Sequence, residues 1–227
     1  MVSVTVEVLA DAEAVARRAA DVIAEVARAS VAARGRFLFA TSGGETPRRM
    51  LQLLAKEDIP WSDVHLFQVD ERVAPAGSPD RNLTQLLENL VARIELPPGH
   101  LHAMPVEETD LESAAKRYAA TLQEVAGNPA TLDLVHLGLG ADGHTASLVP
   151  GDPALEIDDA DVAVSAPYQG YRRMTLTLPA LNRGLRVLWV VTGAGKAEAL
   201  ARLRRGDRLI PAGRVRGDRT VVVTDTP

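Results

Sequence analysis

One apolar run that ends in closely spaced glycines constrains the fold of this chain more than any other feature. Residues 132–137 read Leu-Asp-Leu-Val-His-Leu, and residues 138–148 continue as Gly-Leu-Gly-Ala-Asp-Gly-His-Thr-Ala-Ser-Leu. Buried parallel strands are nearly continuous Val/Leu runs, and ligands bind beyond the carboxyl ends of such strands. The sequence therefore predicts a central strand over 132–138, followed by a site that contains Asp142 and His144.

Strand-like and helix-like segments alternate along the rest of the chain. We expect strands over 2–8 (an edge strand), 37–40, 64–69, 162–165, 174–178, 187–191 and 220–223. We expect helices over 12–33 with Asp11 as the N-cap, after Thr46 as N-cap with Pro47 as the first helical residue, and over 83–94, 111–125 and 194–203. This alternation predicts a layered α/β fold with a mainly parallel sheet, and residues 1–227 are expected to form a single domain because no linker-like segment interrupts them.

A second glycine-rich turn, Ser-Gly-Gly-Glu-Thr-Pro over residues 42–47, lies between an expected strand and an expected helix. Glycines before a helix N-terminus offer backbone N–H groups and the positive end of the helix dipole, which suit a phosphate. An ordinary strand-to-helix turn has the same pattern, so the spacing leaves both interpretations open.

Charged residues follow two other expected strands. Asp70, Glu71 and Arg72 come after the strand over 64–69, and this pattern fits either the edge of a site or a surface turn with a local ion pair. The planar guanidinium of Arg72 suits phosphate or carboxylate. Lys196 follows two glycines at the start of an expected helix, where it is either a point charge for a ligand or an exposed lysine on a capped helix.

The histidines do not have the spacing of a metal site. The sequence has no His-x-x-x-His and no His-Glu-x-x-His, and no second carboxylate cluster accompanies Asp142, so we expect no metal. His65 and His136 fall within apolar strands and are expected to be core or sheet residues. His144, at the end of a strand and after glycines, is the best candidate for a general base.

Composition disfavours several other classes of protein. The chain has no cysteine, which excludes disulfides and thiolate chemistry and fits a reducing compartment. Nothing resembles a signal peptide or a membrane span, so we expect a cytoplasmic protein without a membrane partner. The net charge is −5, and Asp207 and Asp218 interrupt the locally basic segment 202–219, which favours a rim for a phosphorylated substrate over a nucleic-acid surface.

The block Asp-Gly-His-Thr-Ala-Ser-Leu over residues 142–148 closely resembles the signature of the 6-phosphogluconolactonases. The other motifs follow in the family's order: Ser-Gly-Gly at 42–44, Asp-Glu-Arg at 70–72 followed by Asn82, Arg173 and Thr175, and a Gly-x-x-Lys that ends at Lys196. Two positions depart from the family pattern. Glu45 replaces a Ser or Thr, and Tyr168 stands where a Lys-Pro-Pro-Pro segment would begin.

The resemblance implies a Rossmann-like three-layer α/β/α domain that hydrolyses 6-phospho-D-glucono-1,5-lactone to 6-phospho-D-gluconate without metal or organic cofactor. In this interpretation His144 activates water, Asp142 or Asp70 assists it, and backbone N–H groups of the 140–144 turn stabilise the oxyanion. The residues expected to bind phosphate or substrate are Ser42, Gly43, Gly44, Thr46, Arg72, Arg173 and Lys196. The expected partner is a small phosphosugar lactone and no nucleic acid, and the expected assembly is a monomer or weak homo-oligomer.

Two alternatives remain at this level. A glucosamine-6-phosphate isomerase/deaminase shares Asp-Gly-His, but its block continues to a Glu that partners the histidine, where this chain has Val149. A sugar-phosphate sensor on the same scaffold would need no catalytic residues. The presence of both Asp142 and His144 ranks the sensor last.

Overall fold

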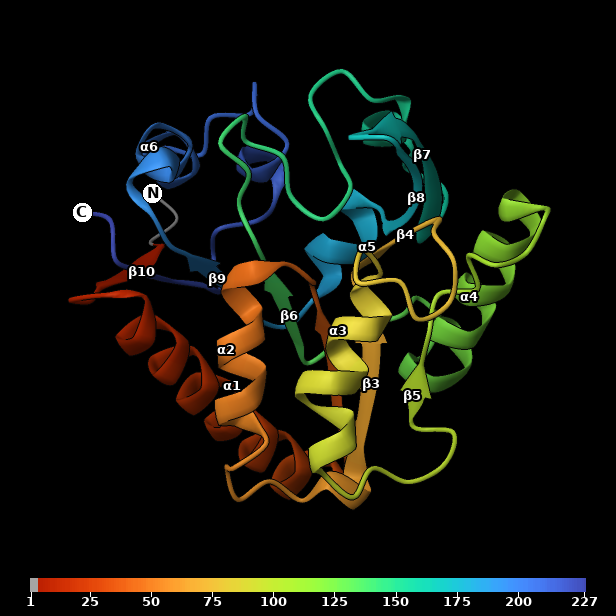
Figure 1. Ribbon diagram of the computed structural model, residues 1–227, viewed down its shortest axis with the longest axis horizontal. Helices are drawn as coiled ribbons and strands as arrows, with labels where there is room; N and C mark the ends of the chain where they lie inside the picture. The colour runs from red at the N-terminus through yellow and green to blue at the C-terminus, as the bar shows by residue number, and fades with distance from the viewer. Residues whose placement is uncertain (1–3) are drawn as a thin grey trace.

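The main sheet has seven parallel strands, and helices cover both of its faces (Figure 1). The computed structural model describes residues 4–227. In spatial order the strands are β1 (Thr5–Val8), β10 (Thr220–Thr224), β9 (Val187–Val191), β6 (Leu134–Leu137), β2 (Phe37–Thr41), β3 (Val64–Gln68) and β5 (Leu101–His102). The expected parallel sheet is confirmed, and the strand predicted over 132–138 is its middle strand, β6.

Side chains of alternate residues along the strands enter two separate cores. The core on one face contains helices α1 (Ala12–Arg34), α2 (Glu45–Leu54) and α3 (Asn82–Asn89), and the core on the other contains α4 (Leu111–Ala126), α5 (Leu178–Arg183) and α6 (Ala197–Arg204). In β2, Phe37 and Phe39 pack with the first set, whereas Leu38 and Ala40 pack with the second. Successive strand residues point to opposite faces, so this apolar run is buried twice and produces the expected three-layer α/β/α architecture.

A second, antiparallel sheet lies above the main sheet, at the upper right of Figure 1. Its order is β4 (Asp70–Arg72), β8 (Tyr171–Leu176) and β7 (Val162–Tyr168). The expected strands over 162–165 and 174–178 exist but belong to this sheet. The charged run 70–72, which the sequence suggested as a site edge or a surface turn, is a strand. Long-range pairing decides which sheet a strand joins, and local periodicity does not report such pairing.

The ends of the helices agree with the sequence in one case and differ in another. Asp11 caps α1, with its side chain accepting from the Ala14 amide at 2.8 Å, as expected. Thr46, by contrast, is not the N-cap of α2, because the helix already begins at Glu45 and Gly44 precedes it without a side-chain cap. The N–H groups of a first turn have no partner within the helix, so Pro47 is tolerated there as well as at the first position.

The remaining differences concern element ends. Residues 2 and 3 of the expected first strand lie outside the described residues, and β1 is an edge strand as predicted. Short 3-10 turns occur at Trp61–Asp63, Val91–Arg93, Pro153–Glu156, Ala194–Lys196 and Ala212–Arg214. Two of these occupy parts of the helices expected over 83–94 and 194–203. Over residues 4–227, no helix has both the length and the apolar character needed to cross a bilayer.

Candidate active site

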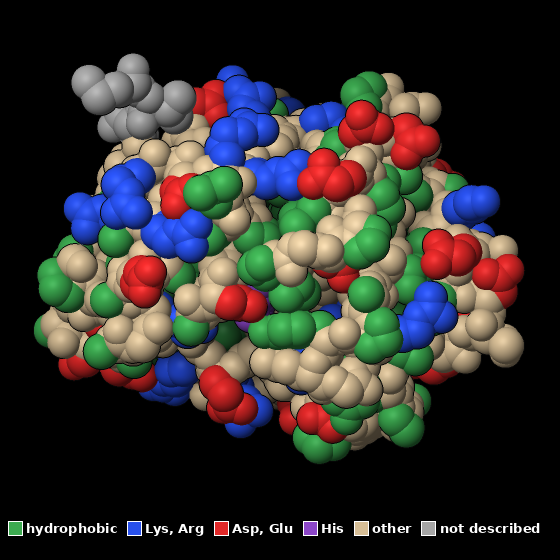
Figure 2. All heavy atoms as spheres, turned by 90° about the horizontal axis from the view of Figure 1, so that it is seen from above, with side chains coloured by type: hydrophobic (Ala, Val, Ile, Leu, Met, Phe, Trp, Pro, Cys, Tyr) green, Lys and Arg blue, Asp and Glu red, His purple; other side chains and the backbone are tan. Residues whose placement is uncertain are grey.

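A cavity of about 350 Å³ lies at the carboxyl ends of β2, β6 and β9, next to the second sheet. Figure 2 looks onto this end of the molecule, where basic and acidic side chains are interspersed. Nine of the ten predicted site residues line the cavity, namely Ser42, Gly43, Gly44, Thr46, Asp70, Arg72, His144, Arg173 and Lys196. The tenth, Asp142, contacts His144. The fold thus brings together residues that are up to 154 positions apart in the chain.

His144 and Asp142 form a close pair. The ring Nδ1 of His144 lies 2.6 Å from Oδ1 of Asp142, and the backbone N–H of His144 donates to the same oxygen at 3.0 Å. A Cβ on Gly140 would lie 2.0 Å from this Nδ1, so only glycine at position 140 leaves room for the pair. Because Nδ1 is engaged by the carboxylate, Nε2 is the ring nitrogen left to accept a proton.

The carboxyl group of Asp142 stays ionised in this arrangement. Burial raises its pKa, but hydrogen bonds from the His144 amide and ring, and a further one from the Tyr168 hydroxyl, outweigh burial and bring the pKa below its usual value. The Tyr168 hydroxyl donates to Oδ2 at 3.3 Å, on the carboxylate oxygen that His144 does not use. An ionised carboxylate holds the imidazole in one orientation and stabilises it once protonated.

Asp70 has a different set of neighbours. Its side chain is buried, and Oδ2 accepts a hydrogen bond from the Ser147 hydroxyl at 2.6 Å. Burial raises the pKa of Asp70, an effect that the Ser147 bond and the charge of Arg173 oppose without cancelling. Of the two acidic residues that the sequence left open, Asp142 is therefore the one bonded to His144.

Arg72 and Arg173 occupy facing positions on β4 and β8. Arg173 is only 4% exposed, and burial lowers the pKa of its guanidinium despite the nearby carboxylate of Asp70. The Nε atoms of both arginines are buried, and neither has a hydrogen-bond partner among the described residues. Two neighbouring cations repel each other, so an anion in the cavity would relieve repulsion and satisfy buried donors.

The loop after β2 offers fewer free donors than its sequence suggested. The Gly44 N–H donates to Oε1 of Gln85 at 3.0 Å, and the Thr46 hydroxyl is bonded to the Thr192 hydroxyl at 3.0 Å. The Ser42 hydroxyl, in contrast, is buried and has no partner among the described residues. Ser42 is thus the residue of this loop whose side-chain hydroxyl has no partner among the described residues, and it lines the cavity.

Two neighbours of this loop explain its composition. A Cβ on Gly43 would lie 2.2 Å from Oδ1 of Asn82, so the close approach of α3 requires glycine here. Glu45, the departure from the family motif, is 83% exposed and paired with Arg48 at 3.0 Å. Its carboxylate therefore points to solvent and does not oppose an anion in the cavity.

Lys196 enters the cavity from the start of α6. Its Nζ donates to the carbonyl oxygen of Leu139, which belongs to the loop after β6. Burial lowers the pKa of this ammonium, although Asp142 counteracts part of the effect. An ammonium group has three donors, so further N–H bonds remain for a ligand.

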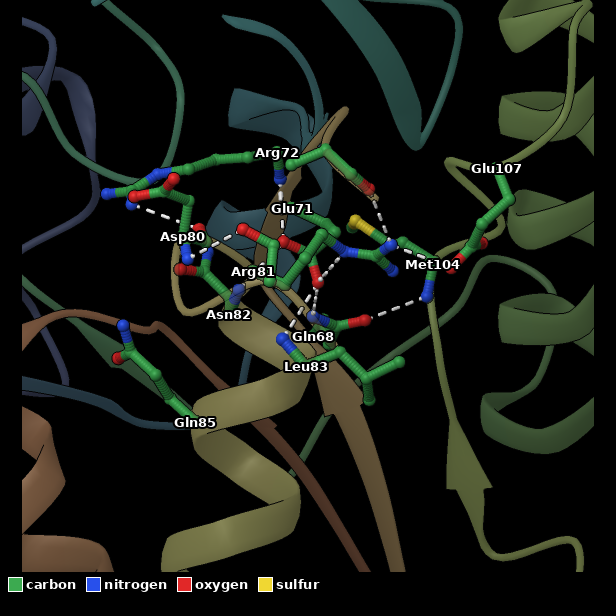
Figure 3. A network of polar contacts seen from close by, with 12 residues as sticks. Gln68, Glu71, Arg72, Asp80, Arg81, Asn82, Leu83, Gln85, Met104 and Glu107 are labelled. Atoms are coloured by element: carbon green, nitrogen blue, oxygen red, sulfur yellow. Dashed lines mark hydrogen bonds and ion pairs between the residues drawn. The ribbon is translucent and has the colours of Figure 1, made fainter. Parts of the chain in front are cut away.

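Glu71 does not line the cavity. It lies in the network of polar contacts that connects β4 with the start of α3 (Figure 3). The carboxylate is completely buried and accepts from the backbone N–H groups of Arg72, Asn82 and Leu83, at 2.7 to 2.8 Å. It also forms an ion pair with the buried Arg81 at 3.1 Å. Because Asn82 and Leu83 are the first residues of α3, Glu71 caps this helix from strand β4.

The other histidines lie away from the cavity. His136 is fully buried in β6, where its Nδ1 is bonded to the Thr41 hydroxyl at 2.9 Å, and burial lowers its pKa to about 3. His65 stacks against His100, as expected for a sheet residue. Within residues 4–227, no group of three or more His, Cys, Asp or Glu side chains could hold a metal ion.

Comparisons with known proteins agree with this arrangement. The family model described as glucosamine-6-phosphate isomerases/6-phosphogluconolactonase matches residues 10–223. The chain belongs to this family. The 6-phosphogluconolactonase of Mycobacterium tuberculosis is 38% identical over 210 residues, covering 88% of this chain and 85% of that protein. The 6-phosphogluconolactonase of Synechocystis sp. is 35% identical over 202 residues, covering 87% and 84%.

Solved structures of the family have the same fold. The crystal structure of the Thermotoga maritima 6-phosphogluconolactonase superposes with a TM-score of 0.88 at 28% identity, covering 98% of this chain and 99% of that one. A monomeric glucosamine-6-phosphate deaminase also shares the fold, with a TM-score of 0.84 at 18% identity. The fold by itself therefore does not separate the two activities of the family.

Two residues that contact the predicted site were not included in it. Ser147 bonds Asp70, and Asn82 donates to the Asp70 carbonyl oxygen at 2.9 Å. Both belong to motifs that the sequence singled out, but their partners lie 77 and 12 positions away. The sequence carries no local signal for such contacts.

Proposed function

We propose that this protein hydrolyses 6-phospho-D-glucono-1,5-lactone to 6-phospho-D-gluconate, with His144 as the general base. The curated relatives named 6-phosphogluconolactonase, at 35% to 38% identity over most of the chain, support the activity. One observation carries the proposal: a single cavity holds a carboxylate-oriented histidine and two arginines with unsatisfied donors. A phosphorylated lactone needs a base for water and cations for its phosphate.

The histidine supplies both proton transfers. Nε2 of His144 takes a proton from water as the water oxygen attacks the lactone carbonyl carbon, and Asp142 stabilises the imidazolium that forms. When the bond between this carbon and the ring oxygen breaks, the imidazolium returns the proton to the departing oxygen. The product is the open-chain acid, and His144 is neutral again.

The 140–144 turn was expected to stabilise the oxyanion, but most of its N–H groups already have acceptors. Within the 140–144 turn, the N–H groups of Gly140, Gly143 and His144 already donate to acceptors inside the loop. We therefore propose that the Lys196 ammonium stabilises the negative charge that develops on the carbonyl oxygen. Lys196 lines the same cavity and borders this loop.

The phosphate fits the arginine side of the cavity. Arg72 and Arg173 supply charge and free Nε donors, and the Ser42 hydroxyl supplies a neutral donor. The start of α2 adds N–H groups without intrahelical partners and the positive end of the helix dipole. Gly43, Gly44 and Thr46 form this wall of the cavity.

The test is a coupled assay for 6-phosphogluconate formation from freshly prepared phospholactone, corrected for spontaneous hydrolysis. Unphosphorylated gluconolactone is the matched control substrate, because it presents the same ring without the anion. We expect efficient hydrolysis of the phosphorylated lactone and a much higher KM for the control. A purified, folded protein that adds nothing to the spontaneous rate would refute the proposal.

Four further expectations stand beside this proposal. Residues 1–227 form one domain, the protein is cytoplasmic, and it is a monomer or weak homo-oligomer that takes no nucleic-acid partner. The absence of cysteine supports a reducing compartment. Size-exclusion chromatography with light scattering at two protein concentrations tests the assembly state.

A further inference from the structure

The tip of the β7–β8 hairpin contacts the His144–Asp142 pair through Tyr168. Two residues with positive φ, Gln169 at 51° and Gly170 at 85°, connect Tyr168 to Tyr171. Positive φ at both central positions is the geometry of a type I′ turn, which matches the twist of a hairpin and keeps its two ends close. The turn therefore gives Tyr168 a defined position.

A register shift aims the Tyr168 side chain. Between Ser165 and Tyr168 the pairing of β7 with β8 moves by one residue: Ser165 pairs with Arg173, whereas Tyr168 pairs with Tyr171. In an unbroken register, residues 165 and 168 would point to opposite faces of the sheet. The one-residue shift places both on the same face, which is also the face of Arg173 because Ser165 pairs with it. Tyr168 consequently lies on the face that carries Arg173.

Tyr168 contacts both halves of the site. Its hydroxyl donates to Oδ2 of Asp142, and its ring meets the His144 ring edge-on at 5.4 Å between centroids. The guanidinium of Arg173 lies over the Tyr168 ring, 5.1 Å from its centroid, and donates to the Tyr168 carbonyl oxygen at 3.2 Å. Tyr168 is not among the residues that line the cavity.

We propose that Tyr168 is a positioning residue that ties the His144–Asp142 pair to Arg173 and so fixes the distance between the base and the phosphate. The proposal rests on the function proposed above, and it gives two parts of one side chain different roles. The hydroxyl acts on the catalytic pair through Asp142. The aromatic ring acts on substrate binding through Arg173.

Two substitutions separate these roles. Tyr168→Phe keeps the ring under Arg173 but removes the hydroxyl, so we expect kcat to fall about tenfold, the low end for a hydrogen bond to a charged group, with KM unchanged within about twofold. Tyr168→Leu removes the ring as well, so we expect the same loss in kcat and an additional rise in KM of about threefold to tenfold. Dissociation constants for 6-phosphogluconate, measured by calorimetry, should follow KM.

Tyr171→Phe is the matched control. Tyr171 faces Tyr168 across the same turn, but its hydroxyl donates to Asp80 at 2.8 Å and not to the catalytic pair. It should leave kcat near the wild-type value. Equal losses in Tyr168→Phe and Tyr171→Phe would show that the hairpin needs its hydroxyls only for folding, and this would overturn the proposal.

A measurement without substrate distinguishes this inference from the proposed lactonase activity. We expect the ring ¹⁵N resonances of His144 to change in Tyr168→Phe and to stay fixed in Tyr171→Phe, because only the first hydroxyl touches Asp142. If the wild type hydrolyses no lactone but these resonances respond, the function fails and the link to His144 stands. Unchanged His144 resonances together with wild-type kcat in Tyr168→Phe would refute the role of Tyr168.

Discussion

Arg72 and Arg173 face each other across the β4–β8 pair, and each has a buried Nε atom without a partner among the described residues. Buried donors in a folded protein are normally satisfied, and like charges are normally kept apart. Both arginines lie in the wall of the cavity that also contains His144. The arrangement is understandable if an anion completes it, and this expectation leads to the first test.

Replacing either arginine should weaken the binding of the phosphorylated product. We expect Arg173→Ala and Arg72→Ala each to lose about 1.5–3 kcal/mol of binding free energy, the value of a charge-assisted hydrogen bond. The control is Arg172→Ala, the neighbouring residue on β8, which is exposed and lies 3.7 Å from Glu112. If calorimetry gives wild-type affinity for 6-phosphogluconate in both variants, the anion binds elsewhere.

Removing the base should act on the chemical step and spare binding. For His144→Ala we expect kcat to fall by about 10² to 10⁴, the usual contribution of a general base, with product affinity nearly intact. His100→Ala removes a histidine outside the cavity and should retain wild-type turnover. Turnover at the wild-type level in His144→Ala would exclude this residue as the base.

The protein should not release ammonia from glucosamine 6-phosphate. In the isomerase pattern a Glu partners the histidine, whereas Val149 occupies this position here and is 9% exposed outside the cavity lining. A valine side chain cannot orient or stabilise an imidazolium, and lactone hydrolysis needs no acid to open the ring before attack. Ammonia release that His144→Ala abolishes would contradict the choice of lactonase over deaminase.

The Glu71 carboxylate should be a large contributor to stability. Glu71→Gln keeps the shape of the side chain but removes the buried negative charge beside Arg81, which then has only Glu107 as a charged partner, and it weakens the acceptor for the Asn82 and Leu83 N–H groups. We expect a loss of about 1.5–3 kcal/mol in the free energy of unfolding. Glu107→Gln is the control, because Glu107 pairs with the same arginine from a half-exposed position. Its loss should stay within about 1 kcal/mol. Urea unfolding measures both, and equal losses would contradict the capping role.

The buried imidazole of His136 should make the protein less stable in acid. Its pKa falls from 6.5 to about 3 on burial, so the folded chain keeps this group neutral while the unfolded chain binds a proton below about pH 6.5. The stability of the fold that depends on a neutral His136 is fully present above pH 6.5, and it is lost as the pH falls toward 3. Unfolding free energies of wild type and His136→Asn at pH 7 and pH 5 test this: the variant should lose less stability between the two. An equal loss would assign acid sensitivity to other groups.

The layered α/β fold was predictable because its signals are local. The apolar runs of β2, β6 and β9 are buried on both faces, and such strands show themselves by composition alone. Asp11 caps the start of α1 through a short-range contact that the sequence predicted, and Gly35 caps its end. The loop after β6 was a predictable site because ligands gather at the carboxyl ends of parallel strands.

Tertiary structure alone decided how the charged residues are used. The sequence placed Asp70, Glu71 and Arg72 in one motif, yet the strand β4 sends Asp70 and Arg72 to the cavity and Glu71 to the cap of α3. Asp142 rather than Asp70 meets His144, and Tyr168 reaches Asp142 because a register shift turns it around. The contact between Asp142 and His144 spans only two positions, whereas the positions of Glu71 and Tyr168 depend on pairing between distant segments. A side chain's neighbours are fixed by such pairing, and local periodicity contains no record of it.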